Sequence, residues 1–456
     1  MTETINEWLS QASDIVWGLP MIILLMGTHI FLTFRLKFIQ KFVPRGIKLS
    51  LKPEKTAEGE ITHFGALTAA LAATIGTGNI FGVAAAVVAG GPGAILWMWL
   101  TGVFGIATKY GESVLGVKYR VKRPDGSFAG GPMYALEHGL KMKPLAILFA
   151  AFTAVAAFGI GNMVQANAIS DVVQELAGEE NATVAAYSTG LVLAIAAGLV
   201  ILGGVKSIAR VTSFFVPIMA IVYCIGCLLI IFHHFTEIPA AIWTILESAF
   251  TGSAAVGGAV GITVKEAVRY GVARGIFSNE SGMGSAPILA AAAKTGNSVR
   301  QGIVSATATF WDTVVVCALT GLAIVLAGDW TNPDLDKGQL AEATFIDIPV
   351  VGPIILTFGL ATFVFSTILG WSYYGEKSLQ YLFGDKVIKP YRVLWVVVIF
   401  FGAVFQSTTV WAFSDVMNAC MAFPNLVAVL LLSNVIAKET KKHMNDLTGK
   451  DDSHGT

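Results

Sequence analysis

Two short segments concentrate glycine, hydroxyl and amide residues inside otherwise apolar stretches. The first spans residues 73–82 (ATIGTGNIFG). Each glycine weakens a helix by about 1 kcal/mol relative to alanine, so the cluster permits local unwinding. Unwound backbone at membrane depth is tolerated where it lines a cavity or is buried in protein, and its amides and carbonyls then become ligands. Gly78 and Gly82 also form a GxxxG helix-packing pattern, but packing alone would not require Asn79. We therefore predict a binding site.

The second segment, 277–287 (FSNESGMGSAP), adds a carboxylate and a proline to the same mixture. Glu280 within a membrane span is costly and by default functional. Pro287 removes a backbone donor and breaks the helical hydrogen-bond ladder. The alternative is a loop between two spans, although the apolar run 286–293 is too short to cross a membrane alone.

Two interrupted helices define the chemistry that this chain could perform. Broken spans at corresponding positions of two halves indicate the binding site of a secondary transporter near the middle of the membrane. The N-terminal ends of half-helices attract an anionic group such as a carboxylate. The C-terminal ends and freed carbonyls suit a cation, either Na⁺ or a substrate ammonium. Both together fit a zwitterion.

Further polar residues lie within apolar spans. Ser366 and Thr367 follow Phe363, and their hydroxyls could complete an oxygen shell for Na⁺. The alternative is hydrogen bonding to their own helix backbone, which is common for Ser and Thr in lipid. Gln165 and Asn167 could reach a substrate or bond a neighbouring helix, and the sequence leaves both open.

Four charged residues in spans are interpreted as structural. Lys109 and Glu112 have i,i+3 spacing, which favours a local ion pair. Asp312 and Asp415 could be linked to ion transport, but we interpret them as capping neighbouring backbone.

Composition identifies the setting of these segments. The chain has 456 residues, of which 55% are hydrophobic and 13% charged, against about 25% charged in a soluble domain. A surface that faces water needs more charged residues than this. We therefore expect a lipid bilayer to cover most of the protein surface. Lys+Arg and Asp+Glu both total 30, which gives no indication of a nucleic-acid partner.

Apolar runs of about 20 residues predict an all-α integral membrane protein with about eleven transmembrane helices. The expected spans are 15–34, 64–90, 92–116, 145–176, 183–204, 209–232, 263–294, 302–327, 350–383, 391–409 and 411–436. The connection 233–262 contains an apolar stretch, 238–250, which we interpret as a short surface helix.

The first span stands alone, and the other ten divide into two sets of five. Because each set crosses the membrane an odd number of times, the second set starts on the opposite side and runs inverted relative to the first. The expected parts are an N-terminal helix and basic segment 1–60, a first repeat 64–232, an external connection 233–262, a second repeat 263–436 and a cytoplasmic tail 437–456.

Loop charges predict the orientation of the chain. The loop after the first span, the loop after the third and the C-terminal tail are rich in Lys and Arg, whereas the loops near 179–180 and 329–347 are acidic. Basic loops mark the cytoplasm, so we expect the N-terminus outside and the C-terminus inside. Lys265, Arg269 and Arg274 lie on the predicted outer side. Either they line a water-filled vestibule, or 263–275 is a surface helix.

Three motifs resemble those of a known family. Residues 90–100 (GGPGAILWMWL), together with ATIGTGNIFG and SNESGMGSAP, are similar to the sodium:alanine (alanine or glycine:cation) symporter family over about 15–440. The resemblance implies a LeuT-type 5+5 inverted repeat plus one extra N-terminal helix in the cell membrane. It also implies import of alanine or glycine driven by Na⁺, or by H⁺, with no organic cofactor.

The resemblance also implies site residues. Residues 76–79 would meet the substrate carboxylate, and 278–283 its ammonium and side chain. Since all amino acids share those two groups, size selection requires bulk, for which Phe277, Met283 and Trp371 are candidates. The candidate substrate-binding residues are Gly76, Thr77, Gly78, Asn79, Gln165, Phe277, Ser278, Asn279, Ser281, Gly282, Met283 and Trp371. The candidate Na⁺ ligands are Ala73, Gly76, Phe363, Ser366 and Thr367.

Two other function classes fit the sequence less well. A channel needs a continuous polar pore, and the sequence has no repeated filter and no polar stripe along several spans. A membrane enzyme needs a nucleophile, base or metal cluster, and neither HExxH nor GxSxG is present. We therefore expect a transporter that is not an enzyme.

Overall fold

The computed structural model describes residues 8–9, 11–13, 16–52, 54, 57–251, 263–405 and 407–448. The start of the expected first span, residues 252–262 of the expected external connection and residues 449–456 of the tail lie outside this part of the chain. Within it, the chain is almost entirely helical, in agreement with the all-α prediction.

The first half of the chain contains the first interrupted segment. Its helices are α2 (Leu19–Arg35), α3 (Val43–Ser50), α4 (His63–Thr74), α5 (Phe81–Gly90), α6 (Gly93–Lys118), α7 (Pro132–Tyr134), α8 (Lys143–Phe158), α9 (Val164–Ala177), α10 (Ala182–Ile201), α11 (Gly204–His233) and α12 (Ile238–Thr251). A π-helical turn, Gly159–Met163, joins α8 to α9. The strands β1 (Val121–Lys122) and β2 (Phe128–Ala129) pair antiparallel. The short helix expected near 238–250 is present as α12.

The second half contains the second interrupted segment. Its helices are α13 (Val264–Asn279), α14 (Ala286–Ala290), α15 (Ser298–Thr309), α16 (Ala318–Ala327), α17 (Lys337–Ile346), α18 (Val351–Phe383), α19 (Ile388–Val404), α20 (Ser407–Leu431), α21 (Ser433–Lys442) and α22 (Met444–Thr448). A π-helical segment, Phe310–Cys317, joins α15 to α16.

Helix length and composition support a membrane protein of several spans. Among the described residues, seven helical segments are long and apolar enough to cross a bilayer, or eight if the bent pair of 19–35 and 39–50 counts as one span. The two parts of the first interrupted segment, α4 and α5, are apolar but shorter. The predicted number of eleven spans is therefore not established, because a broken span does not qualify as one long helix.

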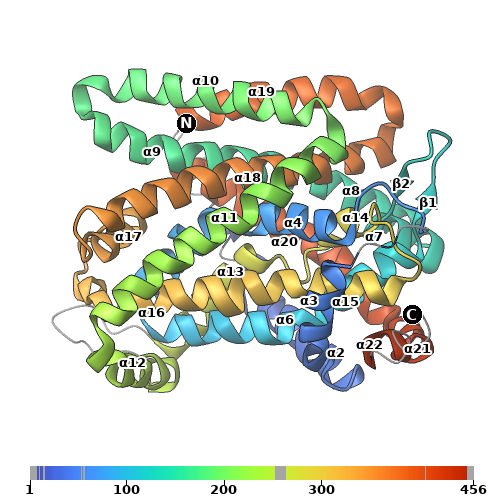
Figure 1. The fold of residues 1–456 in the computed structure, drawn as a ribbon, viewed down its shortest axis with the longest axis horizontal. Coiled ribbons are helices and arrows are strands. Elements are labelled where there is room, and N and C mark those ends of the chain that lie inside the picture. Colours follow the sequence, from blue (N-terminus) through green and yellow to red (C-terminus); the bar gives the residue numbers. More distant parts are fainter. Residues whose placement is uncertain are drawn as a thin grey trace.

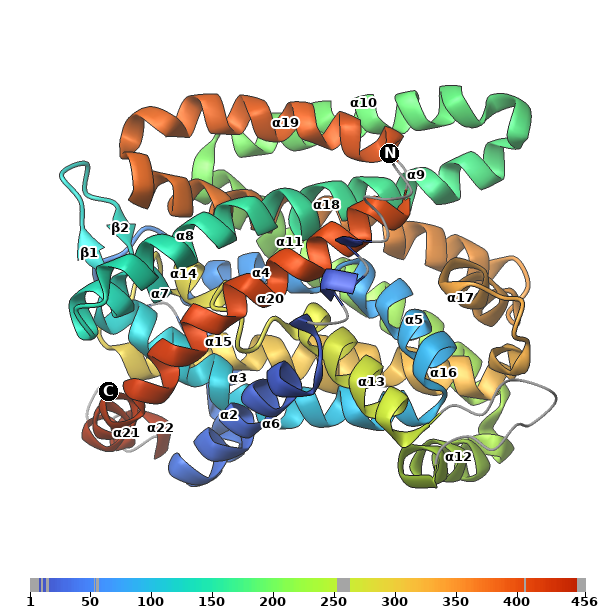
Figure 2. The same ribbon diagram turned by 180° about the vertical axis from the view of Figure 1, so that it is seen from behind.

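The elements form one bundle with two different ends. Figure 1 shows α12 and α17 at the left end and the β1–β2 hairpin, α21 and α22 at the right end, while α10 and α19 run side by side along the top. Figure 2 shows the same arrangement from behind, with α4, α13 and α20 near the middle. The acidic loop that includes Asp334 adjoins α17, and the basic loops adjoin the hairpin and the C-terminal helices. The two loop classes therefore lie at opposite ends.

Local chemistry explains where the first break forms. Thr62 caps the start of α4 by accepting a hydrogen bond from Gly65 N at 3.0 Å. α4 stops at Thr74, where Ile75 is extended with φ −75° and ψ 93°. Helix resumes as α5 at Phe81, so the glycine-rich stretch is a non-α-helical interruption between two apolar helices.

The second break begins at the C-terminus of α13. Glu280 adopts a left-handed conformation (φ 57°), and Gly282 and Gly284 follow with φ of 93° and 80°. Glycine populates this region without a Cβ penalty, so the two glycines lower the cost of the turn. Pro287 lies in the first turn of α14, where its missing N–H leaves no helical bond unmade. α13 is continuous from Val264, so 263–275 is not a separate surface helix.

Candidate functional site

The two breaks lie directly against each other in the middle of the bundle. A Cβ added to Gly78 would lie 3.1 Å from Phe277 Cδ1 and 3.3 Å from Ser278 Cα. Only a residue without a side chain allows the first break to approach the backbone of the second so closely. Residues from the two predicted segments are thus brought into one site.

Asp312 connects both breaks through a single buried carboxylate. Its Oδ1 accepts a 2.7 Å hydrogen bond from Asn79 Nδ2, and its Oδ2 accepts a 2.8 Å bond from the hydroxyl of Ser278. Thr313 Oγ1 donates a further bond of 2.7 Å. The interpretation of Asp312 as a backbone cap is therefore wrong: its carboxylate bonds side chains of the first break, of the last turn of α13 and of its neighbour Thr313. The rule that intramembrane carboxylates are functional by default would have identified it.

The backbone of the first break is held by two amide side chains. Asn79 Oδ1 accepts a 2.9 Å hydrogen bond from Gly76 N, and Gln165 Oε1 accepts a 3.3 Å bond from Thr77 N. Gln165 therefore reaches the break itself. Asn167 instead donates a 2.8 Å bond to the carbonyl of Phe405, so it bonds another part of the chain.

Among the predicted cation ligands, Gly76 and Thr367 lie against each other where α18 crosses the end of α4. A Cβ added to Gly370 would lie 2.7 Å from Ala73 N, so the two helices are in close contact. Thr367 Oγ1 donates a 3.3 Å hydrogen bond to the carbonyl of Ile75. Ser366 Oγ donates a 3.0 Å bond to the carbonyl of Phe363. The oxygens gathered here are of the kind that a hard cation prefers, although Ser366 also shows the backbone bonding that was the alternative.

Hydrogen bonds from three neighbouring helices hold the second break. Asn425 of α20 donates a 2.8 Å hydrogen bond to the carbonyl of Gly282, and Ser281 shares a 3.1 Å bond with Thr309 of α15. Trp371 of α18 donates a 2.8 Å bond from its indole to Glu280 Oε1. Within the break, Ser281 N donates to Asn279 Oδ1 at 2.8 Å.

The three bulky candidates have different surroundings. Trp371 packs on Gly161, where an added Cβ would lie 2.0 Å from Trp371 Cβ, so its ring is held by packing as well as by Glu280. Phe277 stacks on Trp411 with ring centroids 5.5 Å apart. Met283 is fully buried within the second break.

Several polar atoms at the breaks are buried without a hydrogen-bond partner among the residues that the structure describes. They include Thr77 Oγ1 and Asn279 Nδ2, one in each break. Buried polar atoms in native proteins are usually paired, so unpaired ones indicate positions where a ligand group or water completes the bonding.

Lys109 and Glu112 do not form the predicted local ion pair in the described structure. Both are buried, and Lys109 Nζ has no hydrogen-bond partner in the described part of the chain. Glu112 accepts a hydrogen bond from Asn425 instead. One oxygen of the Glu112 carboxylate bonds Asn425, which also holds the second break, and the other oxygen has no hydrogen-bond partner in the described part of the chain.

Cationic and aromatic side chains cover the site toward the α17 end. Arg274 pairs with Asp415 through N–O distances of 2.8 and 3.2 Å, and its guanidinium lies 5.7 Å from the Phe277 ring. Lys337 Nζ lies 3.7 Å from the centroid of Trp411. Burial, followed by the charge of Arg274, lowers the pKa of Lys337 to about 8.

A pocket of about 220 Å³ adjoins this cover. Arg269, Arg274 and Asp415 are among its lining residues, together with Trp17 and Tyr270. The structure therefore favours the vestibule for Arg269 and Arg274, whereas Lys265 is not among the residues that line this pocket.

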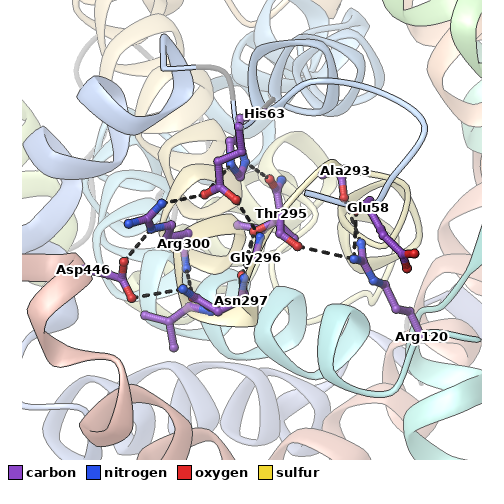
Figure 3. A network of polar contacts seen from close by, with 12 residues as sticks. Glu58, His63, Arg120, Ala293, Thr295, Gly296, Asn297, Arg300 and Asp446 are labelled. Atoms are coloured by element: carbon purple, nitrogen blue, oxygen red, sulfur yellow. Dashed lines mark hydrogen bonds and ion pairs between the residues drawn. The ribbon is translucent and has the colours of Figure 1, made fainter. Parts of the chain in front are cut away.

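The opposite end is closed by a polar network, shown in Figure 3. Arg300 donates to Glu54 at 2.8 Å and to Asp446 at 2.5 Å, so it joins the loop before α4 to the C-terminal helix α22. His63 lies 3.4 Å from Glu54. Burial opposes ionisation of Glu54, but hydrogen bonds from His63, Arg300 and Gly296 N outweigh it and lower its pKa to about 2.

Arg120 closes the same end from a second side. Its guanidinium donates to the carbonyls of Ala291 and Ala293 at 3.0 and 2.8 Å, just after α14, and to the carbonyl of Glu58 at 3.1 Å (Figure 3). Polar contacts therefore lie on both sides of the two breaks along the bundle. This arrangement is suited to binding a small molecule between two closures.

Comparison with known proteins gives consistent matches over the whole chain. A model of the sodium:alanine symporter family matches residues 2–455. The chain is 50% identical over 443 residues to the sodium/alanine symporter AgcS of Methanococcus maripaludis, covering 95% of this chain and 96% of that protein. It is 48% identical over 448 residues to an uncharacterized transporter of Haemophilus influenzae, covering 97% of each.

A solved structure supports the fold. The chain resembles MhsT in complex with L-phenylalanine with a TM-score of 0.53 and 14% sequence identity, covering 83% of this chain and 99% of that one. At this identity the likeness concerns the fold alone, and it confirms the LeuT-type architecture.

Proposed function

Because the chain belongs to the sodium:alanine symporter family, we propose that it imports alanine or glycine together with Na⁺ by alternating access. The family is one of membrane transporters, which supports a transport function rather than an enzymatic one. The observation that carries the proposal is the direct apposition of the first unwound segment and the last turn of α13, where the second break begins. Each has a buried polar atom that lacks a partner in the described structure.

The first break is suited to the carboxylate of an amino acid. Its backbone from Gly76 to Gly78 precedes α5, so the positive end of that helix favours an anionic group here. Thr77 Oγ1 is buried and has no partner within the described chain, so it is free to donate to the carboxylate. Gln165 and Asn79 hold the loop from behind.

The second break is suited to the ammonium and the side chain. It follows the C-terminus of α13, where unpaired carbonyls and the negative end of the helix attract a cation. Ser278, Asn279, Ser281 and Gly282 supply this face in our proposal. Phe277 and Met283 are the proposed walls that exclude longer side chains. Trp371 is the third proposed wall residue, and the hydrogen bond from its indole to Glu280 holds the ring in position.

We assign the coupling Na⁺ to the crossing of α4 and α18. The carbonyls from Ala73 to Gly76 and that of Phe363, with the hydroxyls of Ser366 and Thr367, are the proposed ligands. The hydrogen bond from Thr367 to the carbonyl of Ile75 supports this assignment, because it brings oxygens of both helices within reach of one ion. An ion here would tie the position of α4 to that of α18, which couples ion binding to the conformation of the first break.

Proton coupling is the second candidate. Two buried carboxylates favour it. Glu280 belongs to the second break, and Asp312 bonds Asn79 and Ser278. Intramembrane carboxylates of this kind serve as proton carriers in transporters.

One experiment separates these proposals. Purified protein in proteoliposomes is given labelled alanine with an inward Na⁺ gradient, and then with a pH gradient in the absence of Na⁺. We expect saturable uptake with the Na⁺ gradient alone, and inhibition by unlabelled glycine but not by leucine. Uptake driven only by the pH gradient would show that H⁺, rather than Na⁺, is the coupling ion. Flux without saturation would indicate a channel.

A further inference from the structure

Two histidines and an aspartate from distant parts of the sequence meet at the α17 end of the bundle. α11 ends at His233, and His234 is its C-cap residue. Asp347 is the C-cap residue of α17. His234 Nε2 lies 3.0 Å from Asp347 Oδ2, which places the end of α11 against the end of α17, at the left of Figure 1.

The three side chains lie close to one another. One ligand atom from each of His233, His234 and Asp347 lies within 4.8 Å of the others. The two imidazole rings are nearly perpendicular, with centroids 5.0 Å apart. His233 is exposed, and the side chains of His234 and Asp347 keep 19% and 22% of their surface. An ion from solution can therefore reach all three.

Glu237 supplies the outer support that metal-bound histidines usually have. Its Oε1 lies 3.4 Å from His234 Nδ1, the ring nitrogen that faces away from Asp347. In metal sites the second ring nitrogen of a histidine ligand commonly donates to a carboxylate, which selects the tautomer and orients the ring. Here that contact leaves Nε2 of His234 facing Asp347.

We propose that His233, His234 and Asp347 bind a divalent transition-metal ion of the Zn²⁺ type. Two imidazoles and one carboxylate suit Zn²⁺, with water in the fourth position, whereas Mg²⁺ and Ca²⁺ prefer oxygen ligands only. The ion takes the place of the proton that lies between His234 and Asp347 in the ion pair.

Binding at this point would restrain α17. This helix starts at Lys337, whose ammonium lies over Trp411, and Asp347 is its C-cap residue. An ion that joins Asp347 to α11 fixes one end of the cover. We expect Zn²⁺ to slow opening of the cover and so to slow transport.

Direct binding tests the site without relying on transport. The full chain is purified with a tag that contains no histidine, and Zn²⁺ binding is measured by calorimetry. We expect one Zn²⁺ per chain in the wild type. Loss of an outer-shell partner costs about 10- to 100-fold in metal affinity, so His234→Ala and Asp347→Asn, which remove ligands, should each weaken binding by at least about 100-fold.

His138→Ala is the matched control, because His138 is an exposed histidine on the segment Ala135–Gly139, in another part of the sequence. It should leave the Zn²⁺ affinity unchanged. Co²⁺ should give a tetrahedral absorption spectrum in the wild type and in His138→Ala, but not in the two site variants. Equal Zn²⁺ affinity in all four proteins would overturn the proposal and leave an ordinary ion pair between His234 and Asp347. Because binding is read directly, this outcome is independent of whether the chain carries alanine.

Discussion

Trp371 donates a 2.8 Å hydrogen bond from its indole to Glu280, which lies 91 residues earlier in the chain. Both side chains are almost completely buried. The bond attaches α18, which bears the proposed cation ligands, to the break that bears the proposed substrate ligands. It is a physical connection through which the state of one site can affect the other.

Removing this indole donor should destabilise the protein and weaken coupling. Trp371→Phe leaves Glu280 Oε1 without its partner, and an unsatisfied buried acceptor costs about 1–3 kcal/mol. We expect a lower midpoint of thermal unfolding and a reduced Na⁺ dependence of uptake. The control is Trp395→Phe, because Trp395 is equally buried but its Nε1 has no partner in the described structure. Equal losses in both variants would show that packing, rather than the hydrogen bond, carries the effect.

Thr367→Ala should raise the Na⁺ concentration that gives half-maximal uptake more than it changes the alanine concentration needed. The substitution removes one oxygen from a hard-cation site with no spare ligand. Ser366→Ala should have a smaller effect, because its hydroxyl bonds a carbonyl of its own helix, whereas the hydroxyl of Thr367 reaches the carbonyl of Ile75 in the first break. Thr362→Ala is the control, since Thr362 bonds the carbonyls of Phe358 and Gly359 on the same helix. An unchanged Na⁺ dependence in both Thr367→Ala and Ser366→Ala moves the site elsewhere.

Met283→Ala should admit leucine or valine while keeping Na⁺ dependence. Each methylene buried in the enlarged pocket contributes roughly 0.8 kcal/mol, so a modest cavity makes a larger side chain competitive with alanine. The measurement is inhibition of labelled alanine uptake by unlabelled leucine. Phe277→Ala and Trp371→Ala are compared in the same assay. If leucine competes equally poorly in all three folded, active variants, size selection lies outside these residues.

Uptake should fall as pH rises above about 8 with no pH gradient across the membrane. The buried Lys337 in the closed cover has a pKa of about 8, below its ordinary 10.5, because of burial and then of Arg274, with opposing effects from Asp171, Asp415 and Asp336. Below pH 8 the amine is charged whether the cover is closed or open, so the cost of burying that charge opposes closure fully. Between pH 8 and 10.5 the amine of Lys337 is neutral when the cover is closed but charged when it is open, so rising pH increasingly favours closure. Opening of the cover, and with it uptake, should therefore decline.

Lys337→Met should remove this alkaline decline, because the side chain no longer titrates. Lys389→Met, at an exposed lysine that begins α19, should keep it. Initial rates of alanine uptake from pH 7 to 10 under a fixed Na⁺ gradient are the measurement. A decline that persists in Lys337→Met assigns the pH dependence to another group.

Single-cysteine labelling should place the two ends of the bundle on opposite sides of the membrane. We expect cysteines near Lys122 and Lys441 to react from the cytoplasm and one near Asp334 to react from outside. This follows from the basic and acidic loops at opposite ends. Labelling of positions near Asp334 and Lys441 from the same side would refute the proposed orientation.

The sequence by itself was sufficient for the features that depend on local composition. Few charges and long apolar runs predict a helical membrane protein, and glycine and proline within those runs predict the two breaks. The family motifs near residues 73–100 and 278–287 led to the LeuT-type fold. Each of these features is determined by residues that are close together in the chain.

Only the tertiary structure decided which side chains meet. Asn79 and Asp312 are separated by 233 residues, Glu280 and Trp371 by 91, and His234 and Asp347 by 113. The predicted pair of Lys109 and Glu112 is absent from the described structure, where Glu112 instead bonds Asn425, 313 residues later in the chain. Helical spacing shows which residues share a face. The strength of a buried polar contact depends on the partner that packing brings within about 3 Å, and no local pattern specifies that partner.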